Sequence, residues 1–276
     1  MHMFLCYTWR MKDFKIYFES EKLHFHHTYE QCPVPRSYYR HNHTQYELYV
    51  FFEGAVDFVV EDKTYHVTQN TALLVSPLSY HHPQTLREGV PYHRFVLDFD
   101  RSDVDPALLA ALPTETVAFY FDPTLLSGEL AFAEYAVQHY RKEDIALALR
   151  QLVNRVLLYL QNAKGDTSPA PESANRTVNQ ILQYIRENIE KPLSVRTVAE
   201  ALFLSPVYVS QLFSANMRIG IMDYIKHKKI LLARELIENG TRPTAAAAKL
   251  GFSEYSTFYR LYRKYLGVSP GEDTKE

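Results

Sequence analysis

Through about residue 100, apolar and polar positions alternate in short runs separated by turn residues. The runs include DFKIYFE, YELYVFFEGAVDFVVEDKTYHV, TALLVSP and HRFVLDFD, and they are rich in Tyr, Phe and Val. Alternation of this kind in aromatic and β-branched residues predicts β-strands, and the step around Asp62 and Lys63 predicts a hairpin. Many short strands without intervening helices favour a sandwich or a barrel.

From about residue 106 to residue 163 the spacing becomes helical. Within residues 144–163, apolar positions recur at steps of three and four residues. These positions are Leu149, Val153, Val156, Leu157 and Leu160. One stripe of this helix is expected to pack on the strands, and a second apolar face suits a partner helix in a dimer, with Leu157 and Leu160 expected at that seam. Residues 164–176 are small, polar and proline-rich without periodicity, which predicts an interdomain linker.

The last hundred residues have a helical pattern throughout. Ser205 suits an N-cap and Pro206 a first helical position. A long helix is predicted from Ile221 to Glu238, closed by Gly240. A pair of short helices is predicted on each side of this long helix. Short helix, tight turn and second helix form the helix-turn-helix plan, so the pattern predicts this unit twice.

The second helix of each unit would expose a polar face. The positions expected to face the interior are Val209, Leu212 and Phe213 in the first unit and Phe258, Leu261, Tyr262 and Tyr265 in the second. The positions expected outside are Val207, Ser210, Gln211 and Ser214, then Tyr255, Ser256, Tyr259, Arg260 and Arg263. Such side chains suit base edges and phosphates. The long helix would span roughly 27 Å, a length that can set two recognition helices near one DNA turn, about 34 Å, apart.

Charge and composition narrow the class of protein. The net charge of the 276-residue chain is −2, but residues 171–276 hold 15 Lys and Arg against 11 Asp and Glu, while residues 1–170 hold 15 against 21. A basic module joined to an acidic one suits a polyanion partner for the former. Only two cysteines, no signal-peptide pattern and no long apolar run predict a cytoplasmic protein without a membrane partner.

The stretch HNHTQYELYVFFEG, residues 41–54, carries the candidate chemistry. His41, His43 and Glu47 are two and four residues apart, so on a strand all three would share one face. His81, after SPLSY, could join them from a neighbouring strand. Imidazole and carboxylate ligands suit Zn, Fe, Mn or Ni. Alternatively, these side chains hydrogen-bond one another or line a pocket for an effector.

The tail has a specific family resemblance. LSPVYVSQLF and GFSEYSTFYRLYRKYLGVSP closely resemble the paired helix-turn-helix domain of the AraC/XylS family of bacterial transcription regulators, as do YIRENIEKPLSVRTVAEAL and YIKHKKILLARELI, over about residues 176–270. The resemblance implies base reading by Val207, Ser210 and Gln211 in the first unit and by Tyr255, Ser256 and Arg260 in the second. The chain departs from the family pattern at Lys229, where arginine is usual, and at Ala246, where isoleucine is usual.

The front region, about residues 36–100, resembles a cupin barrel through His-x-His-x3-Glu-x6-Gly and the histidine of SPLSYHH. In cupin enzymes these residues hold a metal, whereas the similar domain of AraC-type regulators usually serves as a metal-free sensor. The resemblance to such regulators therefore implies an effector pocket at His41, His43, Glu47 and His81. No resident metal or other cofactor is predicted, although these four residues are the candidates for one.

The sequence thus predicts a two-domain α+β protein. Residues 1–163 form a cupin-like β-barrel with following dimerisation helices, residues 164–176 the linker, and residues 177–276 an all-α domain with two helix-turn-helix units. The predicted function is sequence-specific DNA binding by a homodimeric transcription regulator under a small-molecule effector such as a sugar. Activation of carbohydrate or other catabolic genes, with contact to RNA polymerase, is implied by the resemblance. A metal-dependent cupin enzyme with a helical appendage is the alternative, and a regulator whose front domain only dimerises is a third.

Overall fold

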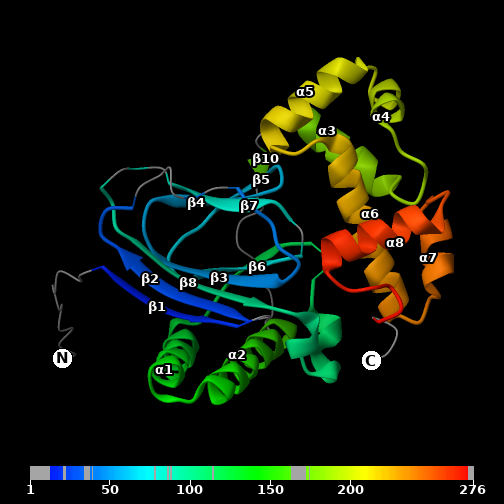
Figure 1. Ribbon diagram of the computed structural model, residues 1–276. Coiled ribbons are helices and arrows are strands. Elements are labelled where there is room, and N and C mark those ends of the chain that lie inside the picture. Colours follow the sequence, from blue (N-terminus) through cyan, green and yellow to red (C-terminus); the bar gives the residue numbers. More distant parts are fainter. Residues whose placement is uncertain are drawn as a thin grey trace, which may run out of the picture.

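The computed structural model describes residues 13–20, 23–33, 38, 40–77, 79–85, 87, 89–113, 115–162, 172–173 and 175–272. They form two lobes, a β-sandwich with two covering helices and an all-helical lobe (Figure 1). The predicted two-domain α+β fold is therefore confirmed.

Two antiparallel sheets make the sandwich. The six-stranded sheet has the order β1 (Phe14–Glu19), β2 (His24–Glu30), β8 (Tyr92–Phe99), β3 (Tyr46–Glu53), β6 (Thr71–Val75) and β9 (Val117–Tyr120). The four-stranded sheet has the order β10 (Glu172–Ser173), β5 (Lys63–His66), β4 (Val56–Val60) and β7 (His81–Thr85). The hairpin predicted around Asp62 and Lys63 joins β4 to β5.

Strand β3 shows why the sheet is buried on both faces. Its side chains alternate between faces, so Leu48 and Val50 join the core beneath the helices, while Tyr49 and Phe51 join the core between the sheets. The turn after β3 uses Gly54 at φ +147°, where an added Cβ would lie 3.1 Å from a backbone oxygen of Pro91. Glycine suits this turn because other residues rarely adopt such a conformation.

Two helices cover the outer face of the six-stranded sheet, α1 (Pro123–His139) and α2 (Lys142–Asn162) (Figure 1). Short 3-10 turns at Arg101–Asp103 and Pro106–Ala111 precede them. The stripe of α2 predicted to pack on the strands does so, but it includes Leu157, which is 1% exposed in the core of the protomer. The prediction that Leu157 lies at a seam with a partner helix is therefore wrong, because the sheet already covers that face.

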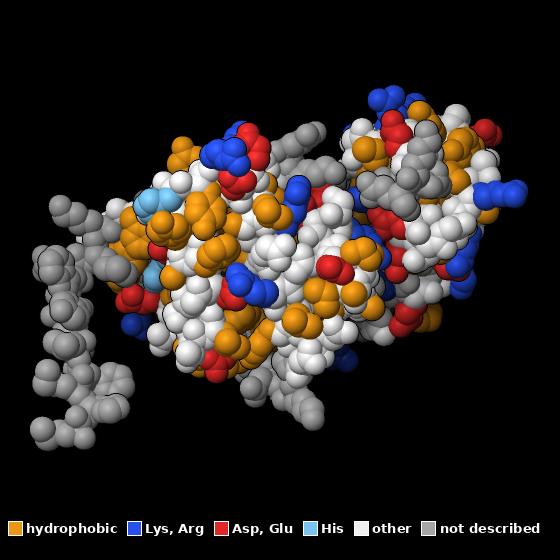
Figure 2. Space-filling model, turned by 90° about the horizontal axis from the view of Figure 1, so that it is seen from below, with side chains coloured by type: hydrophobic (Ala, Val, Ile, Leu, Met, Phe, Trp, Pro, Cys, Tyr) orange, Lys and Arg blue, Asp and Glu red, His pale blue; other side chains and the backbone are white. Residues whose placement is uncertain are grey.

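A different face of α1 and α2 carries exposed apolar side chains. Its exposed large residues are Leu125, Tyr135, Leu147 and Leu158, followed by Tyr140 at the turn between the helices. Figure 2 looks at the lobe from this side, and orange side chains gather there. This surface is called the α1–α2 face below.

The predicted linker is partly ordered against the sandwich. Glu172 and Ser173 form β10, which pairs with Thr64 and Lys63 of β5, and α3 begins at Arg176. The remainder of the linker before residue 172 lies outside the described residues. Strand β10 thus connects the end of the linker to the sheet edge from which the helical lobe departs.

The helical lobe contains six helices in the described residues. They are α3 (Arg176–Glu187), α4 (Val195–Ala201), α5 (Pro206–Met217), α6 (Ile221–Glu238), α7 (Pro243–Lys249) and α8 (Tyr255–Leu266). Ser205 accepts a hydrogen bond from the backbone N–H of Tyr208, as its predicted N-cap role requires. The cap position of α8 is Glu254.

Helix α6 belongs to both helix-turn-helix units. Its first half packs with α3, α4 and α5, and its second half with α7 and α8. Lys229, at its middle, is 6% exposed and donates to the carbonyl oxygens of Lys191 at 2.8 Å and Leu250 at 2.6 Å. Because Lys191 precedes α4 and Leu250 ends α7, one ammonium group ties the two units together. Ala246, the second departure from the family pattern, is fully buried in the second unit.

Within the described residues, no single helix is long and apolar enough to cross a membrane. The bent pair α4 and α5 meets that test only when the two helices are taken together across a 102° bend.

Candidate functional site

The two recognition helices expose the faces that the sequence predicted. In α5, Val209 and Phe213 are buried, whereas Val207 is 66% exposed and Gln211 is also exposed. Ser210 is partly buried beside them. One face of α5 therefore packs into the core while the opposite face is exposed, as in a helix that enters the major groove of DNA.

Helix α8 repeats this arrangement. Phe258 and Tyr262 are fully buried. The exposed positions include Tyr255, Ser256, Tyr259, Arg260 and Arg263. Aromatic, hydroxyl and guanidinium groups on one helix can contact both phosphates and base edges.

The histidine cluster of the front domain is assembled from two chain segments. His41 and His81 face each other in a backbone bridge, with the N–H of each donating to the carbonyl oxygen of the other at 3.1 and 2.9 Å. His43 follows on the same segment, and Glu47 lies on β3. One potential ligand atom from each of the four residues lies within 4.8 Å of the other three. The structure thus brings together all four residues singled out in the sequence.

Backbone carbonyls determine which nitrogen of each ring carries a proton. Nδ1 of His43 lies 3.1 Å from the carbonyl oxygen of Gln45. Nδ1 of His81 lies 2.8 Å from the carbonyl oxygen of Ser79. A carbonyl oxygen only accepts, so both Nδ1 atoms donate and each neutral ring presents the lone pair of its Nε2. Both Nε2 atoms lie against one oxygen of Glu47, at 3.2 Å and 3.0 Å.

If both rings were neutral, three acceptors would therefore meet: Nε2 of His43, Nε2 of His81 and an oxygen of Glu47. The carboxylate accepts only, and it is buried, with Glu47 at 5% exposure and His81 at 1%. Burial raises the pKa of Glu47, but the charges and hydrogen bonds of His81 and His43 outweigh burial and hold that pKa well below its usual range. Burial lowers the pKa of His43, yet its hydrogen bond to Glu47 and the charges of Glu47 and Asp98 raise it to about 9. A positive charge between the two imidazoles and the carboxylate therefore stabilises the site, because it removes the repulsion among their lone pairs.

A cavity of about 340 Å³ opens beside the cluster, between the two sheets. Arg94 lines it and pairs with Glu30 at 2.9 Å, with its guanidinium 4.3 Å from the ring centre of Tyr92. The hydroxyl groups of Tyr49 and Tyr92 lie 2.9 Å apart in the same wall. Aromatic walls with a few convergent polar groups are the usual form of a small-molecule pocket.

The residue before His41 reaches the helical lobe. Arg40 donates to the backbone carbonyl of Asn216, near the end of α5, and its Nη2 lies 3.4 Å from the sulfur of Met217. The same guanidinium donates to the backbone carbonyl of Glu61, in the turn between β4 and β5. One side chain thus joins the histidine cluster segment, the hairpin and the first recognition helix.

The residue before His81 also reaches the helical lobe. Tyr80 packs against the core of the first helix-turn-helix unit, and it exchanges hydrogen bonds with Glu61 at 2.7 and 3.3 Å. Glu61 in turn pairs with Lys228 of α6 at 3.3 Å. Its backbone has φ +56°, a conformation that costs a non-glycine residue about 1–2 kcal/mol. These contacts around Glu61 hold that conformation in place.

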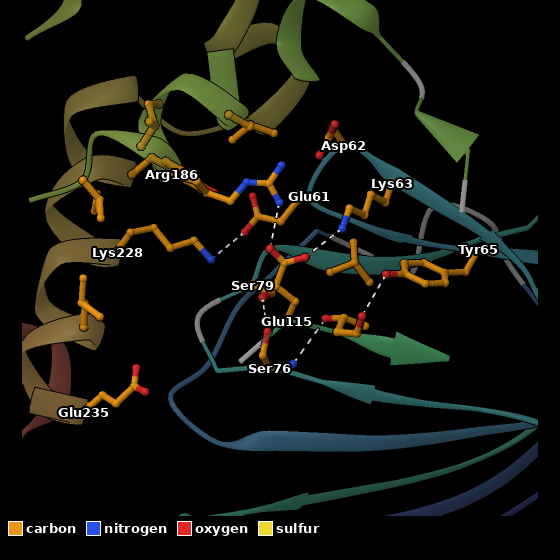
Figure 3. A pocket seen from close by; sticks show the side chains of 17 residues that line it. Glu61, Asp62, Lys63, Tyr65, Ser76, Ser79, Glu115, Arg186, Lys228 and Glu235 are labelled. Atoms are coloured by element: carbon orange, nitrogen blue, oxygen red, sulfur yellow. Dashed lines mark hydrogen bonds and ion pairs between the residues drawn. The ribbon is translucent and has the colours of Figure 1, made fainter. Parts of the chain in front are cut away.

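A second cavity, of about 290 Å³, lies between the lobes (Figure 3). Its apolar wall comes mainly from α3 and α6, through residues such as Ile185 and Leu232. Several of its charged groups are paired across the domain boundary: Glu115 binds Arg186 at 3.0 Å as well as Lys63 at 3.1 Å, and Glu61 binds Lys228 at 3.3 Å. We therefore interpret this cavity as part of the contact between the lobes.

Sequence reasoning missed the residues outside the motifs. Arg94 follows a histidine within a strand, and Arg40 and Glu61 lie beside turns, with no spacing that marks them. The one available signal was position, since Arg40 and Tyr80 directly precede the two histidines His41 and His81. In β2, the stretch HFHH places His27 against Glu134 of α1, with its Nε2 2.7 Å from Nε2 of His93.

Known families match both lobes. Residues 27–174 match the family model described as an AraC-like ligand binding domain, and residues 198–276 match one described as a helix-turn-helix domain. The first match alone covers more than half of the chain. It spans the sandwich from within β2 onward, the histidine cluster and the two covering helices.

Individual relatives are more distant. The chain is 32% identical over 99 residues to an uncharacterized response regulatory protein of Staphylococcus epidermidis, covering 36% of this chain and 39% of that protein. It is 29% identical over 150 residues to LumQ of Photobacterium leiognathi, a probable transcriptional regulator, covering 53% and 56%. Among solved structures, ToxT of Vibrio cholerae is 11% identical with a TM-score of 0.38, over 91% of this chain and 98% of that one. The chain therefore spans less than two thirds of the curated relatives named here.

Proposed function

The chain belongs to the family defined by the AraC-like ligand binding domain, and from this premise we propose that it is a sequence-specific DNA-binding transcription regulator controlled by a small-molecule effector. The observation that carries the proposal is the pair of recognition helices, α5 and α8, built on the shared helix α6. Family membership argues for a regulator and against the alternative of a cupin enzyme, which needs no such pair.

Base reading is assigned to the exposed faces of α5 and α8. The proposed residues are Val207, Ser210 and Gln211 in the first unit and Tyr255, Ser256 and Arg260 in the second. A Gln side chain can bond two atoms of an adenine edge and an Arg side chain two atoms of a guanine edge. Val207 offers an apolar contact of the kind that a thymine methyl group accepts.

DNA binding can be tested with single substitutions on the two faces. Gln211→Ala and Arg260→Ala should each lose on the order of 1–3 kcal/mol of discrimination at particular base pairs. The measurement is fluorescence anisotropy of the full-length protein on promoter DNA and on single-base variants of it, at fixed salt. Gln183→Ala, exposed on α3 and outside both of these faces, is the matched control. Unchanged base preference in both variants would remove the assignment of these faces.

The effector is proposed to occupy the 340 Å³ cavity beside His41, His43, Glu47 and His81. Its polar tyrosines and Arg94 suit a small hydroxylated or anionic molecule, which includes sugars and their acids. From this cavity the route to DNA is short, because Arg40 and Tyr80 adjoin the cluster and contact the first helix-turn-helix unit. An effector that shifts the backbone bridge between His41 and His81 would shift both contacts.

A homodimer completes the proposal. The α1–α2 face supplies exposed apolar surface outside the protomer core, and large exposed apolar patches mark interaction sites. A symmetric pair would present four helix-turn-helix units to neighbouring half-sites. Activation of catabolic genes through contact with RNA polymerase is proposed from the family resemblance.

A further inference from the structure

We propose that Phe203, in the turn between α4 and α5, is a further DNA-contacting residue that packs its ring against apolar surface of the duplex, either a thymine methyl group or a deoxyribose. The inference rests on the proposed function, because it adds a residue outside the two recognition helices to the proposed DNA interface. Phe203 is 96% exposed, the largest exposed fraction among the exposed large apolar residues of the described chain. The fold of the protomer therefore gains nothing from burying this ring.

The backbone of Phe203 makes the choice of residue more unusual. Its φ is +57°, in the left-handed region that glycine enters freely and a bulky side chain enters at a cost. Strained residues of this kind persist where another interaction compensates the strain, often at functional sites. Because the side chain is almost fully exposed, we expect that interaction to come from a binding partner.

The second helix-turn-helix unit contains the same turn with glycine. In both turns the N–H of the following residue donates to a carbonyl oxygen five positions earlier, at 2.9 Å for Leu204 and 3.0 Å for Phe252. Phe203 thus corresponds to Gly251, whose φ is +71°. Gly251 has little room for a side chain, because an added Cβ would lie 3.3 Å from the carbonyl oxygen of Glu190, whereas the side chain of Phe203 extends into solvent. The turn itself therefore does not require an aromatic residue.

The place of Phe203 in the fold indicates that the partner is DNA. Only one residue separates it from Ser205, the N-cap of α5, so their Cα atoms lie within about 7 Å of each other. The first turn of a recognition helix is the part that contacts base edges. Val207 and Tyr208, in that first turn, are also exposed, at 66% and 46%. Phe203 thus continues the apolar part of the proposed base-reading face, and Phe is among the side chains that contact thymine methyl groups.

The test uses full-length protein and the duplex that wild type selects most strongly from a random DNA pool. Phe203→Gly should bind this duplex about 3–10-fold more weakly, the range expected when about half of a Phe side chain is buried on binding. Phe203→Asn, which also tolerates a positive φ, should do the same. The salt dependence of binding should stay as in wild type, because no positive charge is removed. Tyr17→Ala, which removes an exposed aromatic side chain from β1, is the control and should bind as wild type.

Duplexes in which single thymines are replaced by deoxyuridine identify the group that the ring contacts, because deoxyuridine lacks the C5 methyl group of thymine. If the ring packs on a thymine, one replacement weakens binding by wild type and leaves binding by Phe203→Gly unchanged. If the ring packs on a deoxyribose, no single replacement separates the two proteins. Either pattern, together with the weaker binding of Phe203→Gly, supports the proposal.

Urea unfolding of the same proteins separates contact with DNA from a role in folding. Because the ring is exposed and glycine relieves the positive φ, the urea midpoint of Phe203→Gly should equal or exceed that of wild type. Wild-type affinity in both Phe203→Gly and Phe203→Asn would overturn the proposal, as would a lower urea midpoint in both. Unchanged affinity with loss of transcription from the same duplex would assign the ring to RNA polymerase and overturn it too. A wild-type protein that selects no duplex would instead remove the regulator function itself, and this proposal with it.

Discussion

Replacing Lys229 with methionine should destabilise the helical lobe more than any exposed charge substitution on α6. The ammonium group is buried and donates to the carbonyl oxygens of Lys191 and Leu250. Methionine keeps the length of the side chain and removes the donors. Both carbonyl oxygens would then lose a hydrogen-bond partner in an interior position.

The magnitude follows from these two bonds. A hydrogen bond to a charged group contributes about 1.5–3 kcal/mol, so two contribute about 3–6 kcal/mol. Burying the ammonium offsets part of this, and burial accordingly lowers the pKa of Lys229 below its ordinary value. A net loss of about 2–4 kcal/mol in unfolding free energy is expected for Lys229→Met. Lys229→Arg, which restores the residue usual in the family, should lose less because it keeps the donors.

Urea unfolding of the full-length protein, followed by circular dichroism at 222 nm, measures the loss. Lys226→Met is the matched control on the same helix, since the pair that Lys226 makes with Asp223 at 3.5 Å is exposed. Exposed pairs contribute about 0–1 kcal/mol. If Lys229→Met unfolds within about 0.5 kcal/mol of Lys226→Met, the bridge between the two units is not stabilising and the reasoning fails.

Three further predictions concern the interface, the dimer and acid sensitivity. Arg40→Met should speed hydrogen exchange at the end of α5 and weaken effector control of promoter binding, because it removes the contact with Asn216; unchanged exchange there would contradict the route. Leu147→Asp with Leu158→Asp should shift a homodimer to monomer in sedimentation while circular dichroism stays as in wild type, since both residues are exposed; a variant that remains dimeric would exclude the α1–α2 face. Burial, with the charge of His27 beside it, lowers the pKa of His93 from 6.5 to about 4, against the opposing charge of Glu134. Between pH 6.5 and 4 the unfolded chain therefore binds a proton at His93 that the folded chain does not. The unfolding free energy consequently falls as the pH drops through that window. His93→Gln should flatten this dependence of unfolding free energy on pH, measured by denaturation curves across the range.

The helical lobe was the more predictable part of the fold. Its helices carry local signals, such as Ser205 and Pro206 at the start of α5, and the long helix runs from Ile221 to Glu238 as the periodicity indicated. Strand β10 could not be found in this way, because two residues form a strand only through pairing with β5. The burial of Leu157 was missed because periodicity marks apolar faces without showing which one the sheet covers.

The histidine cluster was predictable as a group from its motif, but the expectation of one shared strand was wrong. Only Glu47 lies on β3, whereas His41 and His43 precede that strand and His41 reaches His81 through an isolated backbone bridge. The contacts of Arg40 and Glu61 were not, because they join segments far apart in the chain through docking of the two lobes. The base-reading roles of α5 and α8 and the role of the cluster as an effector pocket remain predictions.

Helix α6 has consequences for how such a protein can diversify. Lys228 faces the sandwich, Lys229 holds the two units together, and Glu238 pairs with Arg101 at 3.3 Å. A substitution on this helix therefore alters several contacts at once, and selection should keep it nearly constant among descendants. The exposed side chain of Gln211 lies outside these contacts of α6. With Gln211 reading bases as proposed, the recognised DNA sequence can change over generations while the contacts between the lobes stay the same.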